Sequence, residues 1–544
     1  MEFGTMANVA TPLVREERDA VSNYLGVASS SITERTEAFC SDRVIKIDDR
    51  ARAGWNGWSP AAGNTRYQPA AAAGLTPDQV KRLKLKWAFG FEGDLAAFSQ
   101  PTILDHTIFV GSASGQVQAI DLGSGCVKWA FQADAAVRAA IVAVPTGYRH
   151  TLLFGDTNGW FYAVEAESGK LFWKKKPEPH ESARVTAAAV AFEDMVYVPT
   201  ASWEEARTTN PEYPCCTFRG SVTAYRIKDG EQRWKTYLIS EKAKETAKNQ
   251  WGPSGAGIWA APTLDTKRGL LYVTTGDNYS APATPMSDAV VALELKSGKV
   301  AWSKQTTPGD VWNTACSQTN SCGGPDFDYG SSVMLEKPGD GRELLLAGQK
   351  SGVVYALDPD KKGEIVWQAR VGKGGVNGGV QWGMASDGQR VYAATSDIFR
   401  GKKTNSDPHD PGAAPLDPKQ GGGLTALRLA NGEKAWFAEP IVCGPNAKPG
   451  CSPAQAGAVT AIPGVVFSGS MDGHLRAYSA EEGKILWDFD TIREFSTVNG
   501  VHASGGSLSG PGPVVVGGIV LVNSGYSRGG GTPGNVLLAF APEN

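Results

Sequence analysis

The sequence contains eight cysteines, whose spacing bears on redox and metal chemistry. Cys316 and Cys322 form one close pair, and Cys443 and Cys451 form another, both in loops rich in Gly, Pro, Asn and Ser. Because no histidine stands near either pair, the spacing favours disulfides over metal sites. Disulfides persist in oxidising compartments, so the sequence predicts a periplasmic or secreted protein, with buried thiols in a cytosolic protein as the alternative.

Cys215 and Cys216 are adjacent, which is an unusual arrangement. They form a small disulfide ring, stay unpaired, or bond elsewhere, for example to Cys40 or Cys126, and strict disulfide geometry alone does not decide among these. Two other kinds of redox site are not encoded. No Cys-x-x-Cys-His is present for covalent haem attachment, and no Gly-x-Gly-x-x-Gly both follows a strand and opens a helix, as a nicotinamide site requires.

Composition and charge narrow the class of protein. The net charge of -3 and the pI of about 6.2 argue against a nucleic-acid-binding protein, which needs a basic surface. No apolar run approaches the roughly 18 residues of a membrane span, and no secretory signal pattern stands at the start of the sequence as given. The 65 glycines, 32 prolines and 16 tryptophans together suggest many strands joined by tight turns, with an aromatic anchor for each set of strands.

One pattern recurs along the chain: Ala, a short apolar and polar alternation, Gly, and then Trp a few residues later. AIDLGSGCVKW and AYSAEEGKILW are examples. The seven complete copies end at Trp129, Trp173, Trp234, Trp302, Trp367, Trp436 and Trp487. Runs of β-branched and aromatic residues with a period of two, such as TIFVGSASGQV and LLYVTTGD, precede the copies and predict strands and hairpins.

An eighth copy is divided between the two ends of the chain. LKLKWAFGF supplies Trp87 near the start, and NVLLAFAPEN supplies the other half at the end. A radial array of sheets must close its ring, because an open edge strand is a liability. The sequence therefore predicts an all-β fold over residues 51–544, an eight-bladed β-propeller whose last blade joins the N- and C-terminal strands. A multi-strand sandwich with coincidental tryptophans is the alternative.

The repeats resemble those of the PQQ-dependent (quinoprotein) alcohol dehydrogenases, from Trp55 to the C-terminus. Within that family, WNGWSPAAGNTRYQ, CCTFRGSVTAY, GGVQWG and NSGYSRGGGTPGNVLLAF are similar to the polyvinyl alcohol dehydrogenase branch. The resemblance implies oxidation of secondary alcohols, polyvinyl alcohol in particular, to ketones with PQQ and Ca²⁺ or another hard cation, and electron transfer to cytochrome c. The alternatives are a PQQ dehydrogenase for another alcohol, polyol or hydroxylated natural product, and a non-catalytic propeller scaffold.

The resemblance implies a metal site made of Glu205, Asn278 and Asp326. Glu205 follows a Ser by three residues in VYVPTASWEE, with Glu204 as its rival, and Asn278 stands in a Gly-x-Asn turn after a strand. Carboxylate and amide oxygens are the ligands that a hard cation takes. The additional Asp328 would suit an ion of higher charge.

Asp326 also aligns with the catalytic base of the family, which opens an Asp-x-Asp element and takes the proton of the substrate hydroxyl. Family members usually have this Asp directly after a Trp. Here Asn313 follows Trp312, and a cysteine-containing insertion precedes Asp326, so Asp310 remains a rival for the base.

Further residues are assigned to PQQ by the same resemblance. Trp259 offers a flat indole surface for a planar cofactor, and Lys350 matches a Lys or Arg that hydrogen-bonds the quinone oxygens. Core packing for Trp259 and a solvated charge for Lys350 are the structural alternatives. The family stacks a disulfide between adjacent cysteines on the other quinone face. The remaining predicted contacts are Arg138, Thr186, Ser202, Cys215 and Cys216.

Residues 1–50 form a separate N-terminal segment in this interpretation. GTMANVATPLVREERDAVSNYLG resembles the last helix of a cytochrome c domain, with apolar spacings of three and four. The polyvinyl alcohol branch carries a haem c domain before its propeller. We therefore expect the segment to be a remnant of that domain without haem, or else an ordinary N-terminal helix packed on the propeller.

Overall fold

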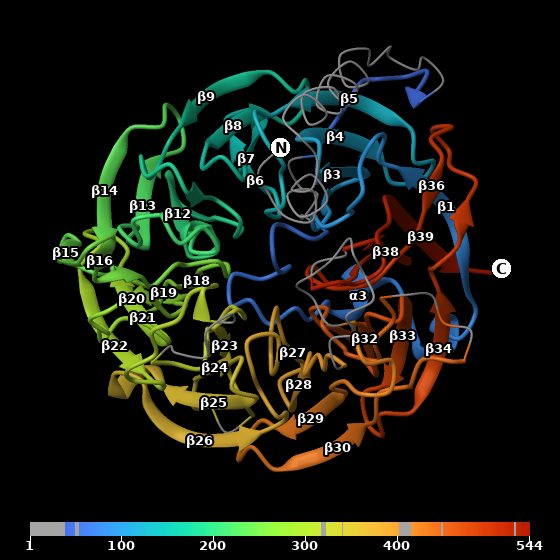
Figure 1. Cartoon of the computed structure of the whole chain (residues 1–544). Helices are drawn as coiled ribbons and strands as arrows, with labels where there is room; N and C mark the ends of the chain where they lie inside the picture. The colour runs from blue at the N-terminus through green and yellow to red at the C-terminus, as the bar shows by residue number, and fades with distance from the viewer. Residues whose placement is uncertain are drawn as a thin grey trace, which may run out of the picture.

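Eight multi-stranded β-sheets stand around a central axis like the blades of a propeller (Figure 1). This arrangement comes from a computed structural model. It describes residues 38–48, 54–316, 323–339, 341–401, 415–445, 447, 450–526 and 529–543. The chain runs once around the ring in sequence order, which confirms the expected eight-bladed, all-β propeller.

Blades 1 to 4 contain antiparallel strands ordered from the axis outward. Blade 1 comprises β2 (Thr102–Leu104), β3 (Thr107–Gly111), β4 (Gln116–Asp121) and β5 (Val127–Gln132). Blade 2 comprises β6 (Val142–Thr146), β7 (Arg149–Gly155), β8 (Phe161–Glu165) and β9 (Leu171–Lys175). Blade 3 comprises β10 (Ala183–Arg184), β11 (Val190–Phe192), β12 (Met195–Ser202), β13 (Ser221–Arg226) and β14 (Gln232–Tyr237). Blade 4 comprises β18 (Thr263–Asp265), β19 (Leu270–Thr274), β21 (Ala289–Glu294) and β22 (Val300–Gln305).

Blades 5 to 7 repeat the same four-stranded order. Blade 5 comprises β23 (Met334–Glu336), β24 (Leu344–Gly348), β25 (Val353–Asp358) and β26 (Glu364–Arg370). Blade 6 comprises β27 (Ala385–Ser386), β28 (Arg390–Ala394), β29 (Leu424–Arg428) and β30 (Lys434–Ala438). Blade 7 comprises β31 (Thr460–Ile462), β32 (Val465–Gly469), β33 (His474–Ser479) and β34 (Ile485–Asp490).

Blade 8 closes the ring with strands from both ends of the chain. It comprises β37 (Val514–Val516), β38 (Ile519–Ser524), β39 (Val536–Pro542) and β1 (Leu83–Gly90). The outermost strand β1 pairs antiparallel with β39, with Leu83 opposite Pro542 and Gly90 opposite Val536. The predicted closure by N- and C-terminal strands is therefore confirmed.

Short elements lie outside the blades. The two-stranded pairs are β15 (Lys244–Ala247) with β16 (Gln250–Gly252), β17 (Ser254–Gly255) with β20 (Asn278–Ser280), and β35 (Glu494–Phe495) with β36 (Ala503–Ser504). The short helices among the described residues are α3 (Ala70–Ala73), α4 (Pro77–Val80), α5 (Glu204–Arg207) and the 3₁₀ turn η2 (Pro359–Lys361).

The repeat tryptophans join neighbouring blades. Trp129 of blade 1 donates its indole N–H to the carbonyl of Ala166 in blade 2 at 2.9 Å. Gly169, in the turn of blade 2, has a φ of +74°, and a Cβ there would lie 2.9 Å from the Trp129 ring. A glycine is needed because it tolerates both the positive φ and the ring above it. The same indole-to-carbonyl bond is made by Trp87, Trp173, Trp234, Trp367, Trp436 and Trp487.

Residues 54–68 link the innermost strands at the axis. Side chains of Asn56, Asn64 and Arg66 hydrogen-bond to blades 2, 4 and 7 respectively. Arg66 is fully buried, and burial lowers its pKa to about 9. Because its donors reach Trp58, Gln100 and blade 7 at once, this arginine fixes the segment to the ring.

The predicted N-terminal segment, residues 1–50, lies outside the described residues except for 38–48. Within that stretch Phe39 bridges Val127, and Cys40 forms a disulfide with Cys126, beside β5. The end of the segment is thus attached to the outer strand of blade 1.

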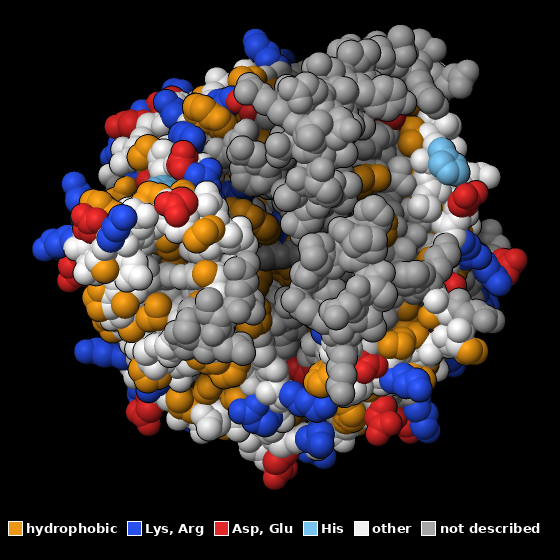
Figure 2. Space-filling model, viewed as in Figure 1, with side chains coloured by type: hydrophobic (Ala, Val, Ile, Leu, Met, Phe, Trp, Pro, Cys, Tyr) orange, Lys and Arg blue, Asp and Glu red, His pale blue; other side chains and the backbone are white. Residues whose placement is uncertain are grey.

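The surface carries charges of both signs. Lys, Arg, Asp and Glu side chains are interspersed along the rim of the disc (Figure 2). Among the described residues, no helix is both long and apolar enough to cross a membrane.

Candidate active site

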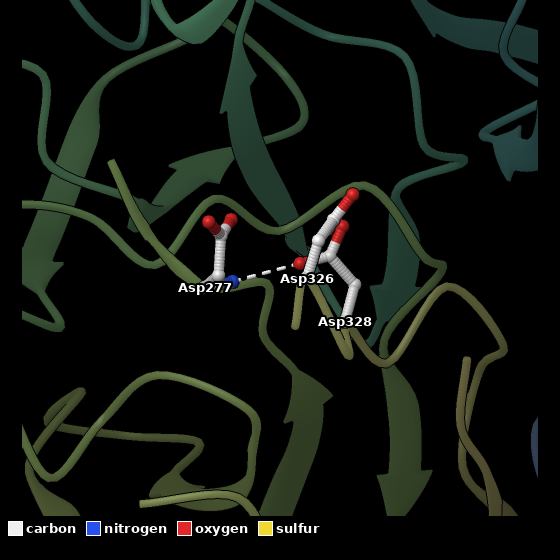
Figure 3. A group of neighbouring side chains, drawn as sticks. All are labelled: Asp277, Asp326 and Asp328. Carbon is white, nitrogen blue, oxygen red and sulfur yellow. Dashed lines mark hydrogen bonds between the residues drawn. The ribbon is translucent and has the colours of Figure 1, made fainter. Parts of the chain in front are cut away.

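Three carboxylates gather where blades 4 and 5 meet. Asp277 follows β19 of blade 4, whereas Asp326 and Asp328 precede β23 of blade 5. One oxygen from each carboxylate lies within 4.8 Å of the others, and all three side chains are buried. Figure 3 shows them projecting from two loops, with the Asp277 backbone N–H donating to Asp328 Oδ1 at 2.8 Å. A group of hard oxygen atoms of this kind suits a cation.

Lys350 stands beside two of these carboxylates. Its Nζ donates to Asp326 Oδ1 and to Asp328 Oδ2, both at 2.8 Å, and the side chain is buried. Burial disfavours the ammonium, but the neighbouring Asp326 and Asp328 raise the pKa of Lys350 above its usual value. The loop between β24 and β25 therefore places a permanent positive charge against Asp326.

Asp326 has an unusual backbone conformation. Its φ of +59° lies in the left-handed region, which residues other than glycine seldom adopt. The Asp310 carboxylate accepts hydrogen bonds from the backbone N–H of Asp326 at 3.2 Å and of Phe327 at 2.8 Å, which holds this conformation. Backbone strain of this kind concentrates at functional sites. Asp310, the rival for the base, is thus engaged in supporting the loop that carries Asp326.

The cluster contains more carboxylates than the single positive charge of Lys350 can neutralise. Burial raises the pKa of Asp326 well above its usual range, although Lys350 opposes this. Burial, followed by the charge of Asp328, likewise raises the pKa of Asp277, whose Oδ2 has no hydrogen-bond partner among the described residues. Asp288 is fully buried, and both its carboxylate oxygens lack partners within the same part of the chain. A bound cation would stabilise the charged forms of these groups.

The two adjacent glutamates after β12 have different surroundings. Glu204 is fully buried and accepts hydrogen bonds from the backbone N–H of Thr217 and Phe218 and from the Tyr213 hydroxyl. The charge of Glu205 instead contributes to raising the pKa values of Asp277 and Asp326. The structure therefore brings Glu205, rather than Glu204, toward the cluster.

Asn278, predicted as a metal ligand, hydrogen-bonds to neighbouring residues in this structure. Its Oδ1 accepts from the backbone N–H of Thr284 at 2.7 Å, and its Nδ2 donates to the carbonyl of Ser254 at 2.9 Å. The amide is thus committed to neighbouring backbone. Asp277, one residue earlier, contributes to the carboxylate cluster.

Trp259 lines a pocket whose wall is made by residues of several blades. Its lining residues directly precede the innermost strands of different blades, so the pocket lies at the axis. They include Phe98 before β2, Arg138 before β6, Thr186 before β11, Trp259 before β18 and Trp382 before β27. A Cβ at Gly330 would clash with the Trp259 ring, so only glycine allows this approach. Lys350 Nζ lies 5.6 Å from the centroid of that ring, and the pocket thus adjoins the carboxylates.

Ser202 does not line this pocket. It ends β12, and its Oγ accepts a hydrogen bond from the backbone N–H of Glu204 at 2.8 Å. The hydroxyl therefore supports the first turn of α5, which carries Glu205.

Cys215 and Cys216 form a disulfide with each other. The alternative bonds to Cys40 or Cys126 are wrong, because those two residues bond together. The ring packs on an apolar cluster that includes Phe218, and neither cysteine lines the Trp259 pocket. Its predicted position against the quinone stays a prediction.

The two loop pairs have different outcomes. The predicted Cys443–Cys451 disulfide is confirmed. Cys316 is also disulfide-bonded, but Cys322 lies outside the described residues.

Comparisons with known proteins identify the family of the chain. Residues 55–371 match the family described as "PQQ: Glucose/ethanol/alcohol dehydrogenase, beta-propeller domain". The chain is 37% identical to a polyvinylalcohol dehydrogenase of Pseudomonas sp. and 34% identical to one of Sphingopyxis sp. (strain 113P3). Each comparison covers 99% of this chain and 87% of the relative. The chain belongs to the PQQ-dependent alcohol dehydrogenases.

This quinoprotein shares its fold with a protein of known structure. The quinohemoprotein alcohol dehydrogenase from Comamonas testosteroni superposes with a TM-score of 0.63 at 19% identity. The match covers 93% of this chain and 84% of that one. At such identity the likeness concerns the fold alone.

The residues of the quinoprotein fit PQQ and a metal ion. Trp259 provides a planar surface at the axis, and Arg138 provides a cation in the same pocket for an acidic cofactor. Asp277, whose Oδ2 has no hydrogen-bond partner in the described part of the chain, belongs to a group of carboxylates that fits a metal ion.

The sequence anticipated part of this arrangement. The structure brings together Arg138, Thr186 and Trp259 in the pocket, and Asp326 and Lys350 beside it. Sequence reasoning missed Asp277 and Trp382. The Gly-Asp step in TTGDN and the non-repeat tryptophan in GGVQWG were the available signals.

Proposed function

We propose that this dehydrogenase oxidises secondary alcohols, polyvinyl alcohol among them, to ketones, using PQQ and a divalent cation. The observation that carries the proposal is the position of Asp326. This buried carboxylate touches Lys350 and the acidic cluster and adjoins the Trp259 pocket. A base, a fixed cation and a flat binding surface therefore stand together, as alcohol oxidation on a quinone requires.

The metal site in this proposal consists of Glu205, Asp277, Asp326 and Asp328, with Asn278 assigned a structural role. Four carboxylates within one region suit a hard cation, and Ca²⁺ accepts irregular sets of oxygen ligands. The additional charge of Asp277 and Asp328 also favours a trivalent ion. Titration of the apoprotein with Ca²⁺ and with La³⁺ compares the two directly.

PQQ, when bound, supplies the electrophilic carbonyl that accepts hydride from the alcohol carbon. Asp326 takes the proton of the substrate hydroxyl, because it is the carboxylate that Lys350 and the neighbouring loop hold in place. Lys350 donates hydrogen bonds and stabilises negative charge near Trp259. Arg138 and Thr186 bind carboxylates of the cofactor from the pocket wall.

Polymer oxidation is inferred from the two relatives named polyvinylalcohol dehydrogenase, which align with almost the whole chain. We assign the electron acceptor to cytochrome c and the location to the periplasm or the outside of the cell. The Cys40–Cys126, Cys215–Cys216 and Cys443–Cys451 disulfides support an oxidising compartment. Residues 1–50 are proposed as the remnant of a cytochrome c domain, and 51–544 as the catalytic propeller without haem.

Reconstitution tests the proposal. The protein is incubated with PQQ and Ca²⁺ and assayed with an artificial electron acceptor on polyvinyl alcohol, 2,4-pentanediol and ethanol. The proposal expects the two secondary alcohols to be oxidised faster than ethanol. Activity confined to another alcohol, polyol or hydroxylated natural product would overturn the substrate assignment. Absence of both PQQ binding and activity would favour a non-catalytic scaffold.

A further inference from the structure

Arg138 contacts an aromatic ring that comes from the opposite side of the propeller. Arg138 precedes β6 of blade 2 and Trp382 precedes β27 of blade 6, so the two stand in opposite blades of an eight-bladed ring (Figure 1). The guanidinium carbon lies 4.4 Å from the centroid of the Trp382 ring and 5.7 Å from that of Tyr526. Both distances lie within the range of a cation–π interaction.

The two rings belong to one aromatic wall beside the Trp259 pocket. Trp382 and Tyr526 have centroids 5.7 Å apart at an interplanar angle of 62°. Trp382 also lies 5.4 Å from Trp259 at an angle of 81°, so it stands almost perpendicular to that indole. Phe98 continues the wall, 5.8 Å from Tyr526. Trp382 therefore contacts both Trp259 and Arg138.

A cation–π contact does not by itself use the N–H donors of an arginine. A guanidinium contacts a ring through its flat face, whereas its N–H donors lie in its plane and point sideways. A carboxylate bound at the edge of Arg138 would thus not compete with its contact with Trp382. The rings also restrict the rotamers of Arg138, which reduces the entropy lost on binding.

We propose that Trp382 and Tyr526 are positioning residues, which hold Arg138 so that its edge binds a carboxylate of PQQ. The inference rests on the proposed function, because it presumes that PQQ occupies the Trp259 pocket. It assigns a purpose to an aromatic pair that comes from blades 6 and 8 and does not belong to the repeat tryptophans.

A double-mutant cycle on PQQ affinity tests the proposal. Dissociation constants are measured by equilibrium titration for the wild type, Trp382→Leu, Arg138→Gln and the double variant. We expect Trp382→Leu to weaken binding about tenfold, and Arg138→Gln about a hundredfold. The double variant should match Arg138→Gln alone, because the tryptophan acts only through the arginine. Independent, multiplying effects would overturn the proposal.

The trimethyl ester of PQQ separates positioning from simple contact. The ester lacks the carboxylate charges, so Trp382→Leu should change its affinity less than twofold. An equal loss for PQQ and ester would show that Trp382 only packs against the cofactor, and would contradict the proposal. Trp382→Phe keeps an aromatic face and should restore most of the PQQ affinity.

Two controls complete the design. Phe39→Leu removes a different arginine–aromatic contact, 3.8 Å from Arg43 beside the outer strand of blade 1, and should leave PQQ affinity unchanged. If Trp382→Leu does not fold, Tyr526→Leu replaces it with an expected threefold loss, and no loss there contradicts the proposal. A wild type that binds no PQQ would instead refute the proposed function itself.

Discussion

The outer strands of the blades repeat one contact, whereas the segments that precede the innermost strands differ from blade to blade. At the outer strands the same contact recurs around the ring, as between Trp129 and the Ala166 carbonyl and between Trp367 and the Leu429 carbonyl. Before the innermost strands, equivalent positions hold unlike residues, such as Arg138 and Trp259. Repetition therefore accounts for the ring, and departure from repetition accounts for the pocket.

This division has a physical origin. Each blade must cover the next in the same way, so the Trp, the turn glycine and the accepting carbonyl are required many times over. The axis is one space shared by eight blades, so each blade supplies a different side chain to it. The loops between strands supply the carboxylates Asp277 and Asp326 in the same unrepeated manner.

The largest expected effect concerns an unrepeated residue, Asp326. Asp326→Asn should lower turnover about 10³-fold, because it removes the base, while PQQ binding is retained. Steady-state assays and a PQQ titration measure the two properties separately. Asp490→Asn, an exposed change in the outer strand β34, is the matched control and should keep full activity. Near-normal turnover of Asp326→Asn would transfer the role of base to another residue.

Trp367 tests the repeated region. Its ring is buried, donates to the Leu429 carbonyl at 3.0 Å and covers Gly432 of the next blade. Trp367→Ala should lower the free energy of unfolding by about 3 kcal/mol, since it leaves a cavity between two blades. Urea denaturation followed by circular dichroism measures this change. The PQQ dissociation constant of the folded variant should stay the same. A large change in this constant would contradict the separation between the repeated contacts of the outer strands and the pocket at the axis.

Two variants, one at Asp277 and one at Asn278, compare the contributions of these residues to the metal site. Asp277→Asn should weaken Ca²⁺ binding roughly 10- to 100-fold, because it removes a carboxylate from the cluster. Asn278→Ala should have a smaller effect on Ca²⁺ binding, since Asn278 Oδ1 accepts from Thr284 and its Nδ2 donates to the Ser254 carbonyl. Calorimetric titration with Ca²⁺ gives both values. A greater loss of Ca²⁺ affinity from the substitution at Asn278 than from Asp277→Asn would identify Asn278 as the ligand.

The smallest expected effect is a pH dependence in the outer part of blade 7. His474 Nδ1 lies 2.7 Å from Asp488 Oδ1, and although burial opposes it, this hydrogen bond raises the pKa of His474. The charged pair thus stabilises the fold below the unfolded pKa of histidine, and the gain disappears as pH rises through the folded value. His474→Gln should cost under about 1 kcal/mol at pH 6 and nothing at pH 9. Unfolding curves at both pH values test this, and an equal cost at both would exclude the charge as its cause.

The fold could be predicted because its determinants are repeated. Seven copies of one pattern, together with Trp87 at one end and the last strand at the other, determine the blade count without knowledge of any contact. Blade 8 confirms this reasoning, since β1 pairs with β39 across the whole length of the chain.

The site could be predicted only in part, because single positions carry it. Asp326, Lys350 and Trp259, which were selected through their motifs, lie close together in the structure. The proximity of Asp277 to Asp326 and Asp328 was not predicted, because these carboxylates come from loops of two different blades. Trp382 was missed because its contact with Arg138 joins opposite blades, a proximity that no local pattern encodes.

The most direct test of the central claim is a crystal structure of the protein with PQQ and Ca²⁺. We predict that the quinone plane lies on Trp259, with the cation bound to carboxylate oxygens of Glu205, Asp277, Asp326 and Asp328. A cofactor seated away from Trp259, or a cation held by other residues, would contradict it.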